Sequence, residues 1–263
     1  MMKLRWKVLG ALVLSGALGL TASPASAAPE HGHGRSPKAL VCTGGEIPSG
    51  TYSRITVKGA CAVAPGATIT VKGDIDIRAG AMLDAQSAPS TITVGGSITS
   101  GRGAFVGLGC QAPQHTGNSA HPCAADPDGQ SHITVKGNVT LVKPMAALIN
   151  GVSLRNLTVL GGGSFEIPWS IKNNTVRGSM VIAGQDTWWL GIMFNKISGD
   201  LLVADVTLDD PTTEGGENED KTYIVRNEIG RNVVCTHVTN GITGYGNTIG
   251  RRALGQCSVL AAA

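Results

Sequence analysis

The chain has 263 residues, of which 42% are hydrophobic and 4% aromatic, and its 21 Lys and Arg exceed its 18 Asp and Glu by three. Lys3, Arg5 and Lys7 account for that whole excess, so the residues after position 27 carry no net charge. A neutral chain lacks the basic surface that is typical of nucleic-acid-binding proteins, and we expect no nucleic acid as a partner.

Residues 1–27 have the order of a secretory signal peptide. The basic residues come first, an apolar stretch over 8–20 follows, and Ala-Ser-Ala at 25–27 supplies a small-residue cleavage site. The apolar stretch is shorter than the roughly 20 residues that cross a bilayer, which makes a retained N-terminal anchor the weaker alternative. No later stretch is long enough to span. The sequence therefore predicts a secreted, extracellular protein that does not remain in a membrane after signal cleavage.

The predicted signal is followed by a polar segment, and all six cysteines lie after that segment. Residues 28–40 are rich in Pro, Gly and His and predict a flexible lead-in to the domain. An even number of cysteines in an exported chain predicts three disulfides, although six cysteines allow many connectivities. We predict that sequence neighbours pair: Cys42 with Cys61, Cys110 with Cys123, and Cys235 with Cys257.

Short β-branched phrases that end at glycine recur along the chain. Ile-Thr-Val-Lys-Gly occupies 55–59, 69–73 and 133–137, and a related phrase that begins with Asn occupies 174–178, 195–199, 227–230 and 247–250. Most successive phrases are separated by about 20–24 positions, which is the range of a solenoid repeat. The longest interval, from Val94 to Val135, suggests two units, and the interval from Ile197 to Ile229 contains the polar segment 205–222. Asn suits the turns between strands, and stacked Asn side chains can form ladders.

A repeat of this length predicts units that bury their apolar faces only by stacking. The intervals lack helical periodicity, and four-stranded propeller blades need about twice the length. The sequence therefore predicts an all-β, single-domain parallel β-helix (β-solenoid) with coils of about 20–24 residues over 41–258. Cys235 and Cys257 are one such interval apart and would come within disulfide reach on successive coils. A β-sandwich with Gly-rich turns is the alternative.

The repeated phrases, together with Gly-Arg-Arg-Ala-Leu-Gly-Gln-Cys at 250–257, resemble a group of uncharacterised secreted bacterial proteins. The resemblance covers roughly 41–258. It implies a right-handed parallel β-helix related in shape to the pectate lyases, and its motifs imply little about chemistry.

Two segments hold candidate metal ligands. Cys110, His115, His121 and Cys123 do not have the spacing of a usual zinc site, and a disulfide across this loop is the preferred interpretation. The acidic segment contains Asp205, Asp209, Asp210, Glu214, Glu217, Glu219 and Asp220 but lacks the residue order of known Ca²⁺ loops. We expect a solvated acidic loop and no cofactor, with Ca²⁺ as the alternative.

Trp188 and Trp189 are the candidate ligand-binding residues. Adjacent residues on a strand point to opposite faces, which predicts that one of the two indoles is exposed. Flat aromatic surfaces can stack on sugar rings, whereas the competing interpretation places these residues, and Trp169 about one coil earlier, in the core.

Catalysis has weaker support in the sequence. Asp186, Asp205, Arg177 and Lys196 fall on successive coils, and their convergence in a groove would indicate a polysaccharide lyase. Glycoside hydrolysis needs two carboxylates about 5–9.5 Å apart, for which Asp205 with Asp186 or Asp209 is the only suggestive set. The lyase family's Asp-His and Arg-x-Pro-x-x-Arg motifs are absent. We therefore expect a secreted non-catalytic protein with a structural or binding role, whose partner is a polysaccharide or another surface protein.

Overall fold

The computed structural model describes residues 36–164, 166–208 and 221–262. The predicted signal peptide and most of the predicted lead-in lie outside the described residues, as does the greater part of the acidic segment. Strand β1 (Lys38–Cys42) begins inside the range 28–40, so the last residues predicted as a lead-in already pair as a strand.

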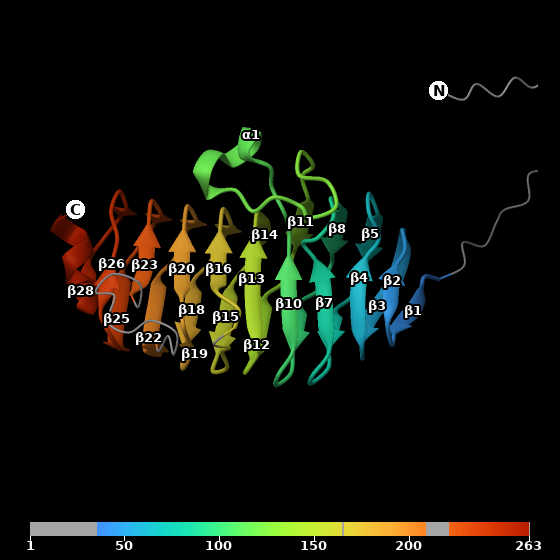
Figure 1. The fold of residues 1–263 in the computed structure, drawn as a ribbon, viewed down its shortest axis with the longest axis horizontal. Coiled ribbons are helices and arrows are strands. Elements are labelled where there is room, and N and C mark those ends of the chain that lie inside the picture. The colour runs from blue at the N-terminus through green and yellow to red at the C-terminus, as the bar shows by residue number, and fades with distance from the viewer. Residues whose placement is uncertain (1–35, 165, 209–220, 263) are drawn as a thin grey trace, which may run out of the picture. The chain divides into compact units, whose positions relative to one another are not determined.

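The described residues form two parallel sheets of many strands (Figure 1). The nine-stranded sheet contains one strand from each coil in chain order: β2 (Gly45–Ile47), β4 (Ala60–Val63), β7 (Met82–Ala85), β10 (Phe105–Leu108), β13 (Ala146–Asn150), β16 (Trp169–Lys172), β20 (Leu190–Met193), β23 (Thr222–Val225) and β26 (Ile242–Thr243).

The second sheet has 19 strands and forms the remaining sides of each coil. Besides β1 it contains β3 (Gly50–Val57), β5 (Thr68–Val71), β6 (Ile75–Ile77), β8 (Thr91–Val94), β9 (Ile98–Ser100), β11 (His132–Val135), β12 (Val139–Val142), β14 (Val152–Leu154), β15 (Leu157–Leu160), β17 (Thr175–Val176), β18 (Met180–Ala183), β19 (Asp186–Thr187), β21 (Lys196–Ile197), β22 (Leu201–Leu208), β24 (Glu228–Ile229), β25 (Val233–Val238), β27 (Thr248–Ile249) and β28 (Ala253–Gly255).

Strand register shows that the sequence repeat is the stacking repeat. Ile69 lies opposite Ile92, the matching residue of a later phrase, and Val176 lies opposite Ile197 in the same way. Every pairing between named strands of the described residues is parallel, which does not fit the antiparallel sheets of a β-sandwich. The chain is therefore all-β with many-stranded parallel sheets, as the repeat predicts.

The longest interval between phrases is one coil and not two. Strand β8 pairs directly with β11, with Val94 opposite Val135. The extra residues leave the stack after β10 and contain α1 (Pro113–Thr116) and the 3-10 helix η1 (Gly117–Ser119). Our expectation of two units was wrong because an insertion of about one coil length lengthens the interval between phrases by as much as an extra coil would. The interval that contains the acidic segment is likewise one coil, with Ile197 opposite Ile229.

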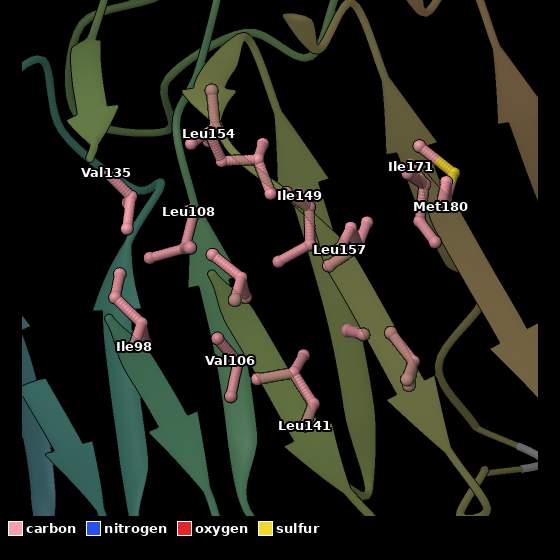
Figure 2. Close-up of a cluster of buried hydrophobic side chains, with 14 of the residues drawn as sticks. Ile98, Val106, Leu108, Val135, Leu141, Ile149, Leu154, Leu157, Ile171 and Met180 are labelled. Carbon is pink, nitrogen blue, oxygen red and sulfur yellow. The ribbon is translucent and has the colours of Figure 1, made fainter. Parts of the chain in front are cut away.

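The core is a continuous row of aliphatic side chains enclosed by the two sheets. Alternate residues of each strand point inward, so β5 reads exposed, buried, half-buried, buried. Figure 2 shows neighbouring coils contributing Val106, Leu141 and Ile149 to the same interior. Because no coil can bury its apolar face alone, stacking is what stabilises each one.

Asn side chains form a ladder along one turn of the stack, as the recurring Asn phrase suggests. The side-chain oxygen of Asn195 accepts hydrogen bonds from the backbone and side-chain nitrogens of Asn174, at 3.0 and 2.9 Å. The Asn195 amide donates to the side-chain oxygen of Asn227 and to the carbonyl oxygen of Ile171. Asn247 continues the ladder by accepting from Asn227. The ladder satisfies backbone groups that the turns would otherwise leave unpaired in the interior.

A second ladder of mixed composition runs along another turn. In each step a side-chain oxygen accepts a backbone or side-chain N–H from the ladder member on the next coil, and the members in chain order are Asp74, Ser97, Asn138, Asn156, Ser179, Asp200 and Asn232. Two hydrogen bonds from Asn232 lower the pKa of the Asp200 carboxyl because they stabilise its ionised form. This ladder is not visible in the sequence because no single residue type repeats along it.

The three predicted disulfides are present: Cys42–Cys61, Cys110–Cys123 and Cys235–Cys257. The last one differs in placement from our expectation. Cys235 lies opposite Gly255 in the strand register, and Cys257 follows in the 3-10 helix η2 (Gln256–Ala262). The bond therefore joins strand β25 to a helix that covers the last coil with Leu260. Among the described residues, no helix has both the length and the hydrophobicity needed to cross a membrane.

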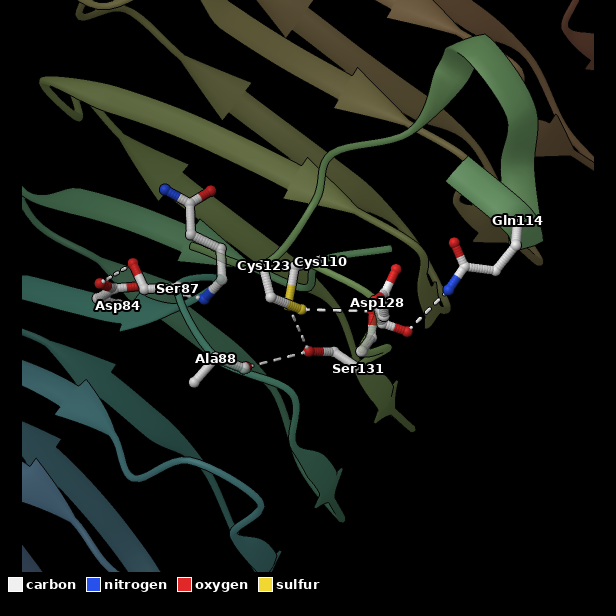
Figure 3. Close-up of a disulfide and its surroundings, with 10 residues drawn as sticks. Asp84, Ser87, Ala88, Cys110, Gln114, Cys123, Asp128 and Ser131 are labelled. Carbon is white, nitrogen blue, oxygen red and sulfur yellow. Dashed lines mark hydrogen bonds between the residues drawn. A yellow bond between two sulfur atoms is a disulfide. The ribbon is translucent and has the colours of Figure 1, made fainter. Parts of the chain in front are cut away.

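The insertion between β10 and β11 is held by Cys110–Cys123 and by local hydrogen bonds (Figure 3). Ser131 lies beside the disulfide and contacts the carbonyl oxygen of Ala88 at 3.4 Å, and Gln114 donates to the carbonyl oxygen of Asp128 at 3.0 Å. The insertion thus forms a defined structure beyond the C-terminal ends of the central strands of the nine-stranded sheet (Figure 1).

Candidate functional site

A pocket of about 710 Å³ lies on the outer face of the nine-stranded sheet. Four coils contribute to it, through strands β13, β16 and β23 and the segment that precedes β20, and the insertion after β10 completes its wall. Its lining residues are His121, Leu148, Ile167, Pro168, Ser170, Lys172, Trp188, Trp189 and Tyr223.

The floor of the pocket follows one outward row of the sheet. Leu148 lies opposite Ser170, Ser170 opposite Gly191, and Gly191 opposite Tyr223. A Cβ atom on Gly191 would collide with the indole of Trp189. The absence of a side chain at Gly191 therefore allows this indole to lie across the strand, where it stacks on Tyr223 with ring centroids 5.7 Å apart and planes 28° apart.

Both predicted tryptophans line the pocket. Trp188 and Trp189 are each half-buried, because they lie in an irregular segment before β20 where the alternation of a strand does not apply. Trp169, on β16, instead points into the core, is fully buried and donates to the carbonyl oxygen of Met145 at 3.3 Å. The core interpretation is thus correct for Trp169 and wrong for the adjacent pair, and the expectation that one indole of that pair is exposed was also wrong.

The insertion docks on strand β16 next to the pocket. The Lys172 ammonium donates to the carbonyl oxygen of Ala120 at 3.1 Å. Asn173 donates to the carbonyl oxygen of Ser119 at 3.0 Å, and the Ser119 hydroxyl contacts the side-chain oxygen of Asn173 at 2.9 Å. These contacts place His121 on the pocket wall.

Burial changes the acid–base behaviour of the two basic side chains in the pocket. It lowers the pKa of Lys172 because it disfavours the charged ammonium. The pKa of His121 is lowered first by burial and then by the positive charge of Lys172, while Asp84 acts in the opposite direction. His121 is therefore neutral at pH 7.

The lowered pKa of His121 predicts a pH dependence of stability. Between the folded-state pKa and the ordinary value of 6.5, the unfolded chain binds more protons than the folded one, so stability rises with pH in this window. We expect stability to fall as the pH drops below 6.5, and His121→Asn to reduce that fall. Denaturant unfolding measured across this range tests it, with the exposed His132→Asn as the control. An equal slope in His121→Asn and the wild type would contradict the prediction.

The four catalytic candidates do not converge. Arg177 and Lys196 lie before β18 and β22, whereas Asp186 and Asp205 lie beyond Ala183 and Ala204. The length of β18 alone separates the two pairs by about 13 Å, at about 3.3 Å per residue.

Each of three candidates has a partner of its own. Lys196 pairs with Glu228 at 3.4 Å, and Asp205 with His237 at 3.0 Å. Arg177 donates to backbone carbonyl oxygens two coils away. The four side chains thus scatter over the surface of the stack.

The candidate metal ligands do not form a metal-binding cluster among the described residues. Cys110 and Cys123 form a disulfide and are not zinc ligands. Within residues 36–164, 166–208 and 221–262, no three His, Cys, Asp or Glu side chains gather closely enough to hold a metal ion. Of the acidic residues in this segment, only Asp205 is described; Asp209, Asp210, Glu214, Glu217, Glu219 and Asp220 lie outside the described residues.

Sequence reasoning missed most of the pocket wall. His121 was considered only as a zinc candidate, and Ser170, Lys172 and Tyr223 were not singled out. The alternation in β16 could have indicated that Ser170 and Lys172 face outward, but their neighbours come from other coils. No family model, curated protein or solved structure matches the chain, so a functional proposal depends on the pocket itself.

Proposed function

We propose that this chain is a secreted, right-handed parallel β-helix that binds polysaccharide, in this pocket, without catalysing a reaction. We also propose that it is related to the uncharacterised secreted bacterial proteins that its repeats resemble, and to pectate lyases in shape. Three disulfides are compatible with an oxidising extracellular location. The outer-face pocket with its aromatic wall is the observation on which the binding proposal depends.

The chemistry of the wall supports a sugar ligand. Trp188, Trp189 and Tyr223 offer ring faces and edges, and pockets of this kind use a few polar groups to orient a ligand against such surfaces. Here Ser170 and Lys172 lie on strand β16 between the aromatic side and the insertion. A sugar ring has both the apolar face and the hydroxyl groups that this combination accommodates.

A lyase or glycoside hydrolase is the alternative function and has weaker support. Of the flank residues that suggested it, Arg177 and Lys196 lie before the paired segments Met180–Ala183 and Leu201–Ala204, and Asp186 and Asp205 lie beyond them. The described residues that line the pocket include no Asp or Glu, and two carboxylates are what glycoside hydrolysis normally requires. No observation on the described residues favours catalysis over binding.

Replacing Trp189 by Ala should weaken glycan binding at least about tenfold, which corresponds to about 1.4 kcal/mol. The change removes the indole that stacks on Tyr223 and part of the pocket wall. Screening the secreted protein on a glycan array, followed by calorimetry with the bound oligosaccharides, measures this loss.

Tyr245→Ala is the matched control, because Tyr245 is an exposed aromatic residue that does not line the pocket. It should bind like the wild type. Binding that is unchanged in Trp189→Ala, or no binding to any glycan, would contradict the proposed function, and the second outcome would favour a protein partner.

A further inference from the structure

We infer that the sugar bound in this pocket carries a negatively charged substituent, which lies against Lys172. This inference rests on the proposed function and specifies the ligand class of the same site. It follows from the position of Lys172, from the absence of a counter-ion among the described residues, and from the hydrogen-bond donors that remain available.

Lys172 is placed on the pocket wall by the register of the sheet. It lies opposite Asn150 on one side and Met193 on the other, two residues along from Ser170 and therefore on the same outward face. Its ammonium reaches the carbonyl oxygen of Ala120 in the insertion, which fixes the direction of the side chain. This hydrogen bond holds the positive charge at the pocket wall.

The ammonium of Lys172 has no counter-ion in the part of the chain that the structure describes. Its partner is a neutral carbonyl group, and none of the ion pairs among the described residues includes it. Among the described residues, those that line the pocket include no acidic side chain.

The Asp84 carboxylate, which acts on the neighbouring His121, is already bound elsewhere. It accepts hydrogen bonds from the backbone nitrogens of Gln86 and Ser87, each at 3.0 Å, and from the Ser87 hydroxyl at 2.6 Å (Figure 3). The Lys172 ammonium is therefore half-buried without an opposite charge among the described residues, which is costly. An anionic group on the ligand would supply the missing partner.

The pocket also presents donors to an anion. An ammonium has three N–H groups, and Lys172 uses one of them for Ala120. A neutral imidazole has one N–H, so His121 adds a donor on the wall beside Lys172. Charge-assisted hydrogen bonds from an ammonium to an anionic oxygen are stronger than neutral ones. A carboxylate and a sulfate ester share this chemistry, and both would accept these bonds while the sugar ring lies against the aromatic wall.

The test is a glycan array that contains neutral, uronate-bearing and sulfated oligosaccharides, probed with the secreted protein and with its Lys172 variants. We expect the bound set to consist of charged glycans, with uronates and sulfates distinguishing the two sources of charge. Lys172→Met should weaken binding at least about tenfold, Lys172→Arg should retain most of it, and added salt should weaken binding in the wild type. Lys136→Met, at an exposed lysine outside the pocket, is the matched control and should bind normally.

The outcomes distinguish failure of this inference alone from failure of the proposed function. If neutral glycans bind as well as charged ones and Lys172→Met has no effect, while Trp189→Ala abolishes binding, the negative charge is disproved and the sugar site remains. If no glycan binds, both fail. Lys172→Met also loses its bond to Ala120, so its melting temperature is compared with that of Lys172→Arg. If Lys172→Arg folds normally but does not bind the charged glycans, the positive charge at this position is not what determines binding.

Discussion

Replacing Asn195 by Ala is expected to lower the free energy of unfolding by about 3 kcal/mol. Asn195 is almost completely buried, and its side chain makes hydrogen bonds to Asn174, Asn227 and the carbonyl oxygen of Ile171. Alanine leaves the backbone nitrogen of Asn174 without its acceptor in the interior and removes the bonds to Ile171 and Asn227, and a buried group without a partner costs about 1–3 kcal/mol. Denaturant unfolding followed by circular dichroism measures the change.

Asn247→Ala is the matched control for this prediction. Asn247 is the last member of the ladder, is only half-buried and bonds to a ladder neighbour on one side alone. Its loss should cost clearly less than that of Asn195, because water can reach the groups that it leaves behind. Equal costs at the two positions would show that the ladder does not stabilise the stack through buried hydrogen bonds.

The double variant Cys235→Ala/Cys257→Ala is expected to lose about 3 kcal/mol of stability. In the chain-entropy model, the size of this loss follows from the sequence separation of 22 between the two cysteines. The structure adds a local reason, because the bond joins β25 to η2, whose Leu260 is buried against the last coil. Release of η2 would expose the end of the core, and hydrogen exchange should then increase first in β25 and β28.

Cys110→Ala/Cys123→Ala provides the comparison. This disulfide lies in the insertion between β10 and β11, away from the ends of the stack. Its removal should increase exchange in the insertion and weaken glycan binding, because His121 and the Ala120 contact of Lys172 belong to that segment. If instead it raised exchange in β25, the assignment of Cys235–Cys257 to the closure of the C-terminal end would be wrong.

Much of the fold was predictable because the same short sequence pattern recurs in successive coils. The Ile-Thr-Val phrase places alternate side chains inward, and the glycine or Asn that follows allows the turn. Phrases that are one coil apart in the sequence therefore lie opposite each other, as Ile69 and Ile92 do. The Asn ladder followed from the same periodicity, whereas the disulfides were predicted from the closeness of the paired cysteines in the sequence.

Insertions and mixed-residue features were harder to predict. The longest interval between phrases contains one coil and an insertion, and only the direct pairing of Val94 with Val135 reveals this. The second ladder uses Asp, Ser and Asn interchangeably, because each offers an oxygen to the next backbone N–H. A search for identical residues cannot detect such chemical equivalence.

By itself, the sequence determined the all-β class, the parallel stacking repeat and the three disulfides. It also indicated Trp188 and Trp189 as candidate ligand-binding residues. Only the tertiary structure decided the pocket, and it separated the four residues that suggested catalysis. The physical reason is that stacking brings together residues from different coils, so Ser170, Lys172 and Tyr223 become neighbours of the tryptophans only when the register is known. The docked insertion then adds His121, which no strand repeat could have placed there.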